Sequence, residues 1–232
     1  MLIIKGLIGG LFQIALFGVF FVVTAGLLPG GTWYWERALI FLAVYGAIVE
    51  VTIIVLAIKA PESLEARLAS PGGGKQTRAD RMASAFLIST FFAWMVFVPV
   101  DVFYLKLLPP PQLEVSVAGG VMLFLGFAII CAAIYENRFA VSYVAYQTDR
   151  GQTLIDTGPY SVVWHPMYLG VLPYFGGMAL WLESYAALIA VSVIMAALVV
   201  IIFVEEKTLR EALPGYADYM KRVRYRLVPF VW

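Results

Sequence analysis

Six long apolar segments alternate with polar stretches along the chain. They lie near residues 7–28, 38–58, 84–105, 115–134, 167–182 and 185–204. Because a helix rises about 1.5 Å per residue, about 20 apolar residues are needed to cross the core of a bilayer. The segments reach or approach this length. The pattern therefore predicts an all-α, polytopic membrane protein with about six transmembrane helices.

The fifth segment is the shortest of the six and contains Pro173, Gly176 and Gly177. Proline and glycine favour kinks, so we expect this helix to be kinked, tilted or only partly inserted. Glu183 and Ser184 alone separate it from the sixth segment. The last two helices should consequently form a tight hairpin.

Composition supports a membrane location and excludes several functions. The chain is 62% hydrophobic and 13% charged, with a mean hydropathy of +0.88, outside the range of soluble domains. A net charge of +1 gives no reason to expect a nucleic-acid partner. One cysteine, Cys131, and one histidine exclude a disulfide within the chain and provide no metal-ligand set, so we expect no metal.

The distribution of basic residues predicts the orientation of the helices. Of the sixteen Lys and Arg residues, only Arg37 and Lys106 fall in segments that a six-helix topology assigns to the outside. Basic residues are enriched in cytoplasmic loops, which places both termini and the 135–166 segment in the cytoplasm. Residues 33–35, Trp-Tyr-Trp, are interpreted as an interfacial aromatic belt on the far side.

Two polar features in the first half have more than one interpretation. Between residues 60 and 82, PESLEARLA is typical of a short amphipathic helix, and PGGGKQTRADR of a flexible stretch. This region is a solvated loop, a lid or an element at the lipid surface. Glu50 lies near the middle of the second segment, where a carboxylate is costly unless it is paired or protonated. It contacts either substrate or another helix, and we leave it out of the predicted site.

A polar, aromatic-rich turn leads directly into the fifth apolar segment, in the stretch GPYSVVWHPMYLG at residues 158–170. Pro166 has a fixed φ and no amide hydrogen, so it suits the first position of a helix, with His165 as the cap. The helix is predicted to begin at His165 or Pro166. Such a start exposes amide hydrogens, here those of residues 167–169, and favours an anionic group.

Three aromatic side chains surround this helix start: Tyr160, Trp164 and Tyr168. Flat rings can stack on a heterocycle or cover a cation. They are equally typical of a capped helix at a membrane surface.

Two adjacent acids, Glu205 and Glu206, follow the sixth segment, and a basic, tyrosine-rich tail follows them. The C-terminal end of a helix favours cations. If the sixth helix ends here, this acid pair requires a positive partner, which is either a nearby Lys or Arg or a cationic cofactor.

Three motifs carry a family resemblance: GPYSVVWHPMYLG, the EEKTL that begins at Glu205, and the tail PGYADYMKRVRYRLVP. Together they resemble the isoprenylcysteine carboxyl methyltransferase family, over roughly the C-terminal 100 residues. The resemblance implies methyl transfer from S-adenosyl-L-methionine at the cytoplasmic membrane face. It also divides the chain into an N-terminal membrane region of four helices, residues 1–134, and a methyltransferase region, residues 135–232.

The resemblance also implies a set of cofactor-binding residues in the 135–166 segment, the fifth helix and the end of the sixth. These are Gln147, Gln152, Thr153, Leu154, Ile155, Tyr160, His165, Pro166, Met167, Tyr168 and Glu205. It assigns no catalytic residue. The implied acceptor is hydrophobic or membrane-embedded, such as an isoprenylcysteine-like carboxylate, a lipid or a thiol, and it reaches the site from the bilayer.

The chain departs from this family at two positions. Trp164 stands where members usually have Arg before the His-Pro pair, and Ile201 stands where eukaryotic members have an Arg that contacts substrate. We therefore predict an apolar approach for the acceptor, through room left beside the short fifth segment. Alternatively, Arg224 or Arg226 reaches in from the tail to anchor it.

Two other functions share parts of this pattern. A nicotinamide-dependent membrane reductase of the sterol-reductase kind has a similar HPxY segment, but the adjacent glutamates and basic tail favour the methyltransferase. A non-enzymatic membrane protein is the third hypothesis, supported by the two departures from the family.

Overall fold

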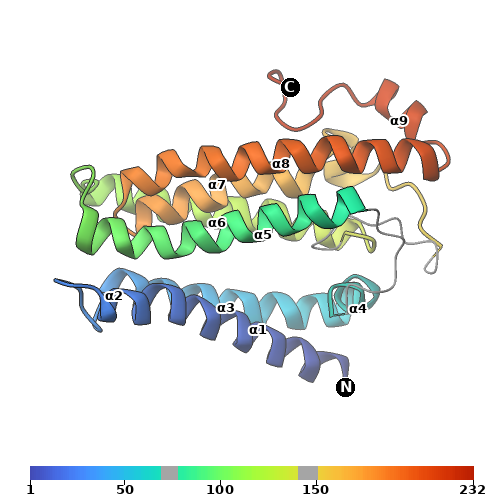
Figure 1. The fold of residues 1–232 in the computed structure, drawn as a ribbon. Coiled ribbons are helices and arrows are strands. Elements are labelled where there is room, and N and C mark those ends of the chain that lie inside the picture. The colour runs from blue at the N-terminus through green and yellow to red at the C-terminus, as the bar shows by residue number, and fades with distance from the viewer. Residues whose placement is uncertain (69–77, 141–150) are drawn as a thin grey trace.

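The computed structural model describes residues 1–68, 78–140 and 151–232 (Figure 1). The described residues form helices joined by short connections, and one isolated bridge, Val163 to Tyr225, is their only β-type pairing. The helices are α1 (Leu2–Gly18), η1 (Val19–Val23), α2 (Thr24–Leu27), α3 (Glu36–Lys59), α4 (Pro61–Leu68), α5 (Arg78–Val100), η2 (Asp101–Leu105), α6 (Leu113–Glu136), η4 (Gly158–Ser161), α7 (Pro166–Trp181), α8 (Tyr185–Ala212) and α9 (Tyr216–Arg222).

All six predicted apolar segments are helical, which confirms the all-α fold. Among the described residues, five helical stretches are long and apolar enough to cross a membrane. They are Leu2–Leu27, Glu36–Lys59, Arg81–Leu105, Leu113–Glu136 and Tyr185–Ala212. The remaining segment, α7, has 16 residues and is therefore the short helix that the sequence indicated. The molecule is thus an integral membrane protein with five or six membrane helices.

The helices form two groups (Figure 1). Helices α1, α2 and α3 lie along one side, and α5 to α8 form the other. Aromatic side chains fill the core: the Phe17 ring stacks on Tyr45 with centroids 5.5 Å apart, and Phe175 meets Trp94 edge to face at 5.2 Å. Each of these pairs lies within one group. Between the groups, the Tyr45 ring of α3 meets the Phe127 ring of α6 edge to face at 5.4 Å, a favourable arrangement that joins the two.

Four glycines bring α6 and α7 into backbone contact. A Cβ on Gly126 would lie 2.4 Å from the Tyr174 nitrogen, and one on Gly177 would lie 2.3 Å from the Leu123 nitrogen. Gly119 and Gly170 face these positions. Small residues allow such close approach between membrane helices, so this seam fixes α7 although α7 is short.

The α7–α8 connection is the predicted tight hairpin. Glu183 has a positive φ of 68°, and the Ser184 hydroxyl accepts a hydrogen bond of 2.8 Å from the Ala187 amide. A serine in this position caps the start of α8. Pro173 lies inside α7, which continues to Trp181.

The sixth helix is longer than the sequence analysis predicted. Helix α8 continues from the predicted end at residue 204 to Ala212, because the following EKTLREA residues favour helix. The break comes at Pro214-Gly215, where Gly215 has a φ of 82°. Glu205 and Glu206 therefore lie inside α8. The prediction that this acid pair stands at the end of the sixth helix was wrong.

One N-terminal interpretation also changes. Trp33 and Tyr34 are exposed as predicted, but Trp35 is buried against Phe21 and Phe103. The predicted amphipathic helix is α4, which buries Leu64; residues 69–77 lie outside the described residues. Both carboxylate oxygens of Glu50 are buried, with no hydrogen-bond partner among the residues described.

Candidate functional site

The start of α7 has the predicted geometry. The helix begins at Pro166 with His165 as its N-cap. The Leu169 amide donates to the His165 carbonyl at 3.0 Å, so Leu169 does not offer a free amide as predicted. Because a helix leaves its first amides without intrahelical partners, Met167 and Tyr168 remain as the available donors.

The C-terminal tail packs against the segment before α7. The amides of Trp164 and His165 donate to the carbonyls of Tyr225 and Arg226, both at 3.1 Å. The Trp164 indole donates to the Val223 carbonyl at 2.8 Å, and the Tyr219 hydroxyl donates to the Tyr160 carbonyl at 2.7 Å. Residues far apart in the sequence therefore form one wall at this end of the bundle.

Glu206 is a buried charge with internal partners. Its carboxylate accepts two hydrogen bonds from Arg226, at 2.8 and 3.2 Å, and lies 3.2 Å from His165 Nε2. Such a forked Arg–carboxylate pair is strong and directional. Glu206 is 3% exposed, so this cluster connects α8, the α7 start and the tail.

Trp164 contributes to the same cluster. The Arg226 guanidinium lies over the rings of Trp164 and Trp232, 5.1 and 4.9 Å from their centroids, and 5.4 Å from the Phe203 centroid. Cation–π contacts of this kind are favourable. Trp164, the first departure from the family pattern, thus provides a surface for an arginine that comes from the tail.

Glu205 differs from its neighbour because it faces a pocket. Its carboxylate accepts a hydrogen bond of 2.9 Å from the Tyr168 hydroxyl. His165 Nδ1 lies 3.9 Å away, beyond hydrogen-bond distance. The Tyr168 ring stacks on His165 at 5.5 Å. The Glu205 side chain is 28% exposed, so it can accept further hydrogen bonds from a ligand.

A single pocket gathers most of the predicted residues. Its lining is Asn137, Phe139, Ala140, Gln152, Thr153, Leu154, Ile155, Tyr160, Trp164, His165, Met167, Tyr168, Glu205, Thr208, Leu209, Leu213, Tyr216 and Tyr219. Its cavity volume is about 80 Å³, and the empty space around it, about 820 Å³, includes open solvent. A nucleoside-sized ligand would therefore also occupy the open part.

The structure places the predicted set as follows. All but two of its members line this pocket. Pro166 is absent from the lining and only begins the helix, while Gln147 lies outside the described residues. The sequence analysis missed Tyr216, Tyr219 and the Thr208 face of α8. The spacing of the two tyrosines could have identified them, because residues three positions apart share one face of a helix, here α9.

Tyr216 provides an unused donor in this pocket. Its hydroxyl is buried and has no hydrogen-bond partner among the residues that the structure describes. Burial raises the pKa of Tyr160 to about 12 and also raises the pKa values of Tyr216 and Tyr219. These phenols therefore stay protonated at neutral pH. Because a buried polar group without a partner is costly, Tyr216 indicates space for an acceptor atom of a ligand.

Part of this chain is similar to a known family. Residues 115–214 match the phospholipid methyltransferase family. The match runs from α6 to the turn after α8 and includes every pocket residue except Tyr216 and Tyr219. It confirms the predicted resemblance of the C-terminal region to membrane methyltransferases and does not favour the reductase. No curated protein matches the chain.

Proposed function

We propose that the protein is a membrane methyltransferase that uses S-adenosyl-L-methionine and acts on a hydrophobic or membrane-embedded acceptor. The main observation is that Glu205, the Tyr216 hydroxyl and the α7 start meet in one pocket, and that most of this pocket's lining lies in the region that matches the phospholipid methyltransferase family. The basic residues favour a cytoplasmic position for this pocket.

The pocket residues fit the groups of the cofactor. The free amides of Met167 and Tyr168 suit its carboxylate, because helix starts favour anions. Tyr160 and Trp164 offer rings beside an adenine, and the Tyr216 hydroxyl, which has no hydrogen-bond partner in the described part of the chain, offers a donor. Glu205 can accept from ribose hydroxyls or face the cationic sulfur.

When bound, the cofactor would supply an electrophilic methyl group that the acceptor attacks in line, with S-adenosylhomocysteine as the leaving group. Such a step makes modest demands on acid–base groups, so positioning and exclusion of water can supply most of the acceleration. The residues of this chain act accordingly: the Glu206–Arg226 cluster holds the tail over the α7 start, and Tyr216 and Tyr219 of the tail cover one side of the pocket.

A binding titration tests this function. Purified protein in nanodiscs should bind S-adenosylhomocysteine and not NADPH. Glu205→Gln should weaken S-adenosylhomocysteine binding about tenfold or more, because a charge-assisted hydrogen bond contributes roughly 1.5 to 3 kcal/mol. Glu211→Gln, exposed on the same helix, is the matched control and should bind like the unaltered protein.

His165→Ala should weaken binding as well, although His165 also contacts Glu206. For that reason the Glu205 variant is the cleaner probe. Equal affinity in a folded Glu205→Gln variant and in the control would remove Glu205 from the site. NADPH binding in place of S-adenosylhomocysteine would overturn the function.

A further inference from the structure

One exposed face of α8 changes from apolar to basic along its length. Ile189, Val193, Val200 and Phe203 are between 49% and 65% exposed, and they form one stripe because each residue turns about 100° around a helix. We name it the outer stripe. Lys207, one turn further, is exposed on the same face. In a membrane helix such a stripe contacts acyl chains, and basic residues lie at the head groups. The boundary between these two regions of the lipid therefore falls between Phe203 and Lys207.

The tail returns to α8 at this boundary. After α9 it runs back beside α8 (Figure 1), and the Trp232 ring lies 6.1 Å from the Phe203 ring. The Trp232 backbone oxygen accepts hydrogen bonds from the amides of residues 226–228, at 3.0 to 3.2 Å. These bonds close residues 226–232 into a turn, which we name the tail turn. Because tryptophan is enriched at membrane interfaces, the position of Trp232 agrees with the boundary.

The tail turn exposes two adjacent apolar side chains. Phe230 is 89% exposed and Val231 is 80% exposed. Removing apolar surface of this kind from water is favourable. Since the turn lies beside the outer stripe, the bilayer that covers the stripe can also cover Phe230 and Val231. The tail turn therefore has the features of an interfacial anchor.

A groove of about 460 Å³ lies between α8 and the tail turn. Its lining is Phe203, Glu206, Lys207, Arg210, Glu211 and Arg226. Within this lining, Arg226 and Glu206 engage one another. The groove begins at the boundary and extends to the basic side of it, so it lies at the depth of the head groups.

The remaining charges of the groove favour an anion. Lys207 is exposed, and the Arg210 side chain is 53% exposed, with its nearest guanidinium nitrogen 3.8 Å from Glu206. Glu211, also exposed, is the one acid of the lining that Arg226 does not engage. Two cations therefore face one acid. Lysine and arginine both bind phosphate, lysine as a point charge and arginine through its planar fork.

The groove is separate from the pocket. Helix α8 presents Glu205, Thr208 and Leu209 to the pocket, and Lys207 and Arg210 to the groove. Because successive residues turn about 100° around the helix, these two sets lie on opposite faces. The two linings share no residue. A ligand in the groove would therefore leave the pocket free.

The features predicted for an acceptor route do not connect the two sites. Ile201 is buried, and the α6 backbone fills the space beside Gly170 and Gly177, so the room predicted beside the short fifth helix is absent at these glycines. Arg226, one of the two alternative anchors, pairs with Glu206. None of these residues lines the pocket. The groove thus requires an occupant of its own.

We propose that this groove binds an anionic phospholipid, with Lys207 and Arg210 on its phosphate and its acyl chains along the outer stripe. Phe230 and Val231 of the tail turn lie among the neighbouring acyl chains. The proposal rests on the membrane location of the helices and does not depend on the proposed function. The predicted orientation places this end of the bundle in the cytoplasm, and the cytoplasmic leaflet carries the anionic lipids that attract basic residues.

The head group is tested by native mass spectrometry of the protein in detergent micelles, titrated with dioleoylphosphatidylglycerol or dioleoylphosphatidylcholine. The anionic lipid should bind more tightly. Lys207→Gln combined with Arg210→Gln should weaken its binding about tenfold. Lys5→Gln combined with Lys59→Gln removes the same charge from exposed positions at the same end of the bundle and should leave the affinity unchanged. Glu211→Gln, which removes the acid of the groove, should tighten binding.

The depth of the tail turn is tested with a fluorescent probe. In a Cys131→Ser background, Val231→Cys is labelled with nitrobenzoxadiazole, and the protein is placed in nanodiscs of mixed phosphatidylglycerol and phosphatidylcholine. Lipids with a nitroxide near the top of the acyl chain should quench this probe, and aqueous iodide should not. Lys221→Cys, exposed on α9, is the control, and iodide should quench a probe there.

Each alternative occupant gives a different result. Equal binding of the two lipids, or an affinity that the Lys207 and Arg210 changes leave intact, would overturn the phosphate site. Competition by glycerophosphoglycerol, the same head group without acyl chains, would identify a soluble anion and overturn the lipid. Quenching of the residue 231 probe by iodide would place the tail turn in water, and protection from both quenchers would indicate a second copy of the chain. Either result would overturn the anchor, and none of them bears on S-adenosylhomocysteine binding.

Discussion

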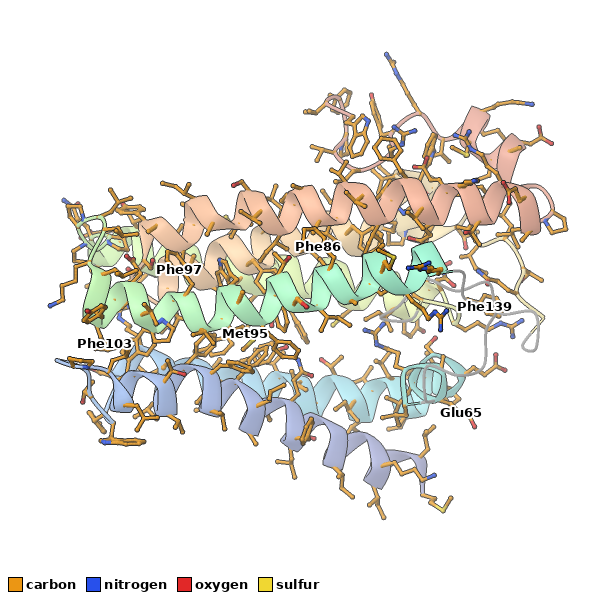
Figure 2. The ribbon with its side chains drawn as sticks, in the orientation of Figure 1. Glu65, Phe86, Met95, Phe97, Phe103 and Phe139 are labelled. Atoms are coloured by element: carbon orange, nitrogen blue, oxygen red, sulfur yellow. The ribbon has the colours of Figure 1, made fainter. Side chains whose placement is uncertain are left out.

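The two ends of the helix bundle use polar residues in opposite ways. Figure 2 labels Phe103 at one end and Phe139 at the other. At the Phe103 end, buried Asp101 accepts a hydrogen bond of 2.6 Å from Ser184 and one of 3.0 Å from the Leu107 amide. The Trp181 indole donates to the Arg37 carbonyl at 2.9 Å. These groups satisfy one another, and we call this the closed end. Two other buried atoms here, Trp35 Nε1 and Ser116 Oγ, have no hydrogen-bond partner among the described residues, but neither residue lines the pocket that Glu205 faces.

The Phe139 end has the same kinds of residues, but some of them can form further hydrogen bonds. We call it the open end. Glu206 is fully engaged by Arg226 and His165. Glu205, one position earlier, faces the pocket, and the buried Tyr216 hydroxyl has no partner in the described part of the chain. Buried polar groups are normally satisfied. The comparison therefore separates polar residues that hold the fold from those that are available to a ligand.

The largest effect should come from the structural acid of the open end. Glu206→Ala leaves Arg226 and His165 without their carboxylate, and breaking a buried ion pair costs roughly 3 to 5 kcal/mol. We expect that loss in the free energy of unfolding, measured by sodium dodecyl sulfate titration from dodecylmaltoside micelles. Glu211→Ala, exposed on the same helix, should change little. A Glu206→Ala protein as stable as this control would show that the cluster does not hold the tail.

A smaller effect should come from the closed end. Asp101→Ala removes the acceptor of two hydrogen bonds and should lower the free energy of unfolding by roughly 1 to 3 kcal/mol. Asp101→Asn should recover part of it. The affinity for S-adenosylhomocysteine should not change in either variant, unlike in Glu205→Gln. A loss of affinity in Asp101→Asn without a loss of stability would contradict the separation of the two ends.

Local signals in the sequence predicted much of this arrangement. Apolar length placed six helices, and Pro166 after His165 placed the start of α7, because proline restricts the backbone locally. The cofactor set came from a family resemblance, and the structure brings most of it together in one pocket. Whether these residues bind the cofactor stays a prediction.

The missed features depend on contacts between distant segments. The pairing of Glu206 with Arg226 requires the tail to fold back on α7, and no local pattern specifies this. The apolar pattern did not distinguish Glu205 from Glu206, since both appeared to end a helix, and only the family resemblance singled out Glu205. In the structure, a step of one residue rotates the side chain by about 100° around α8, which gives the two acids different surroundings. Trp35 was wrongly assigned to an interfacial belt, because an aromatic residue near a helix start is also suited to the core.

The smallest expected effect is a pH dependence of stability that arises at the open end and not at the closed end. Burial raises the pKa of Tyr160, at the open end, from 10.0 to about 12. In the unfolded chain the phenol loses its proton near the ordinary value, while the folded state keeps it. Stability from this group is therefore complete below pH 10 and is lost as the pH rises toward 12. Thermal unfolding temperatures measured across this interval should fall, and Tyr160→Phe should make the fall shallower. Tyr104→Phe, which alters an exposed ring near the closed end, should leave the slope as it is. Equal slopes in all three proteins would mean that Tyr160 ionises as freely in the folded state as in the unfolded chain, and the pocket would then be more open to water than its packing indicates.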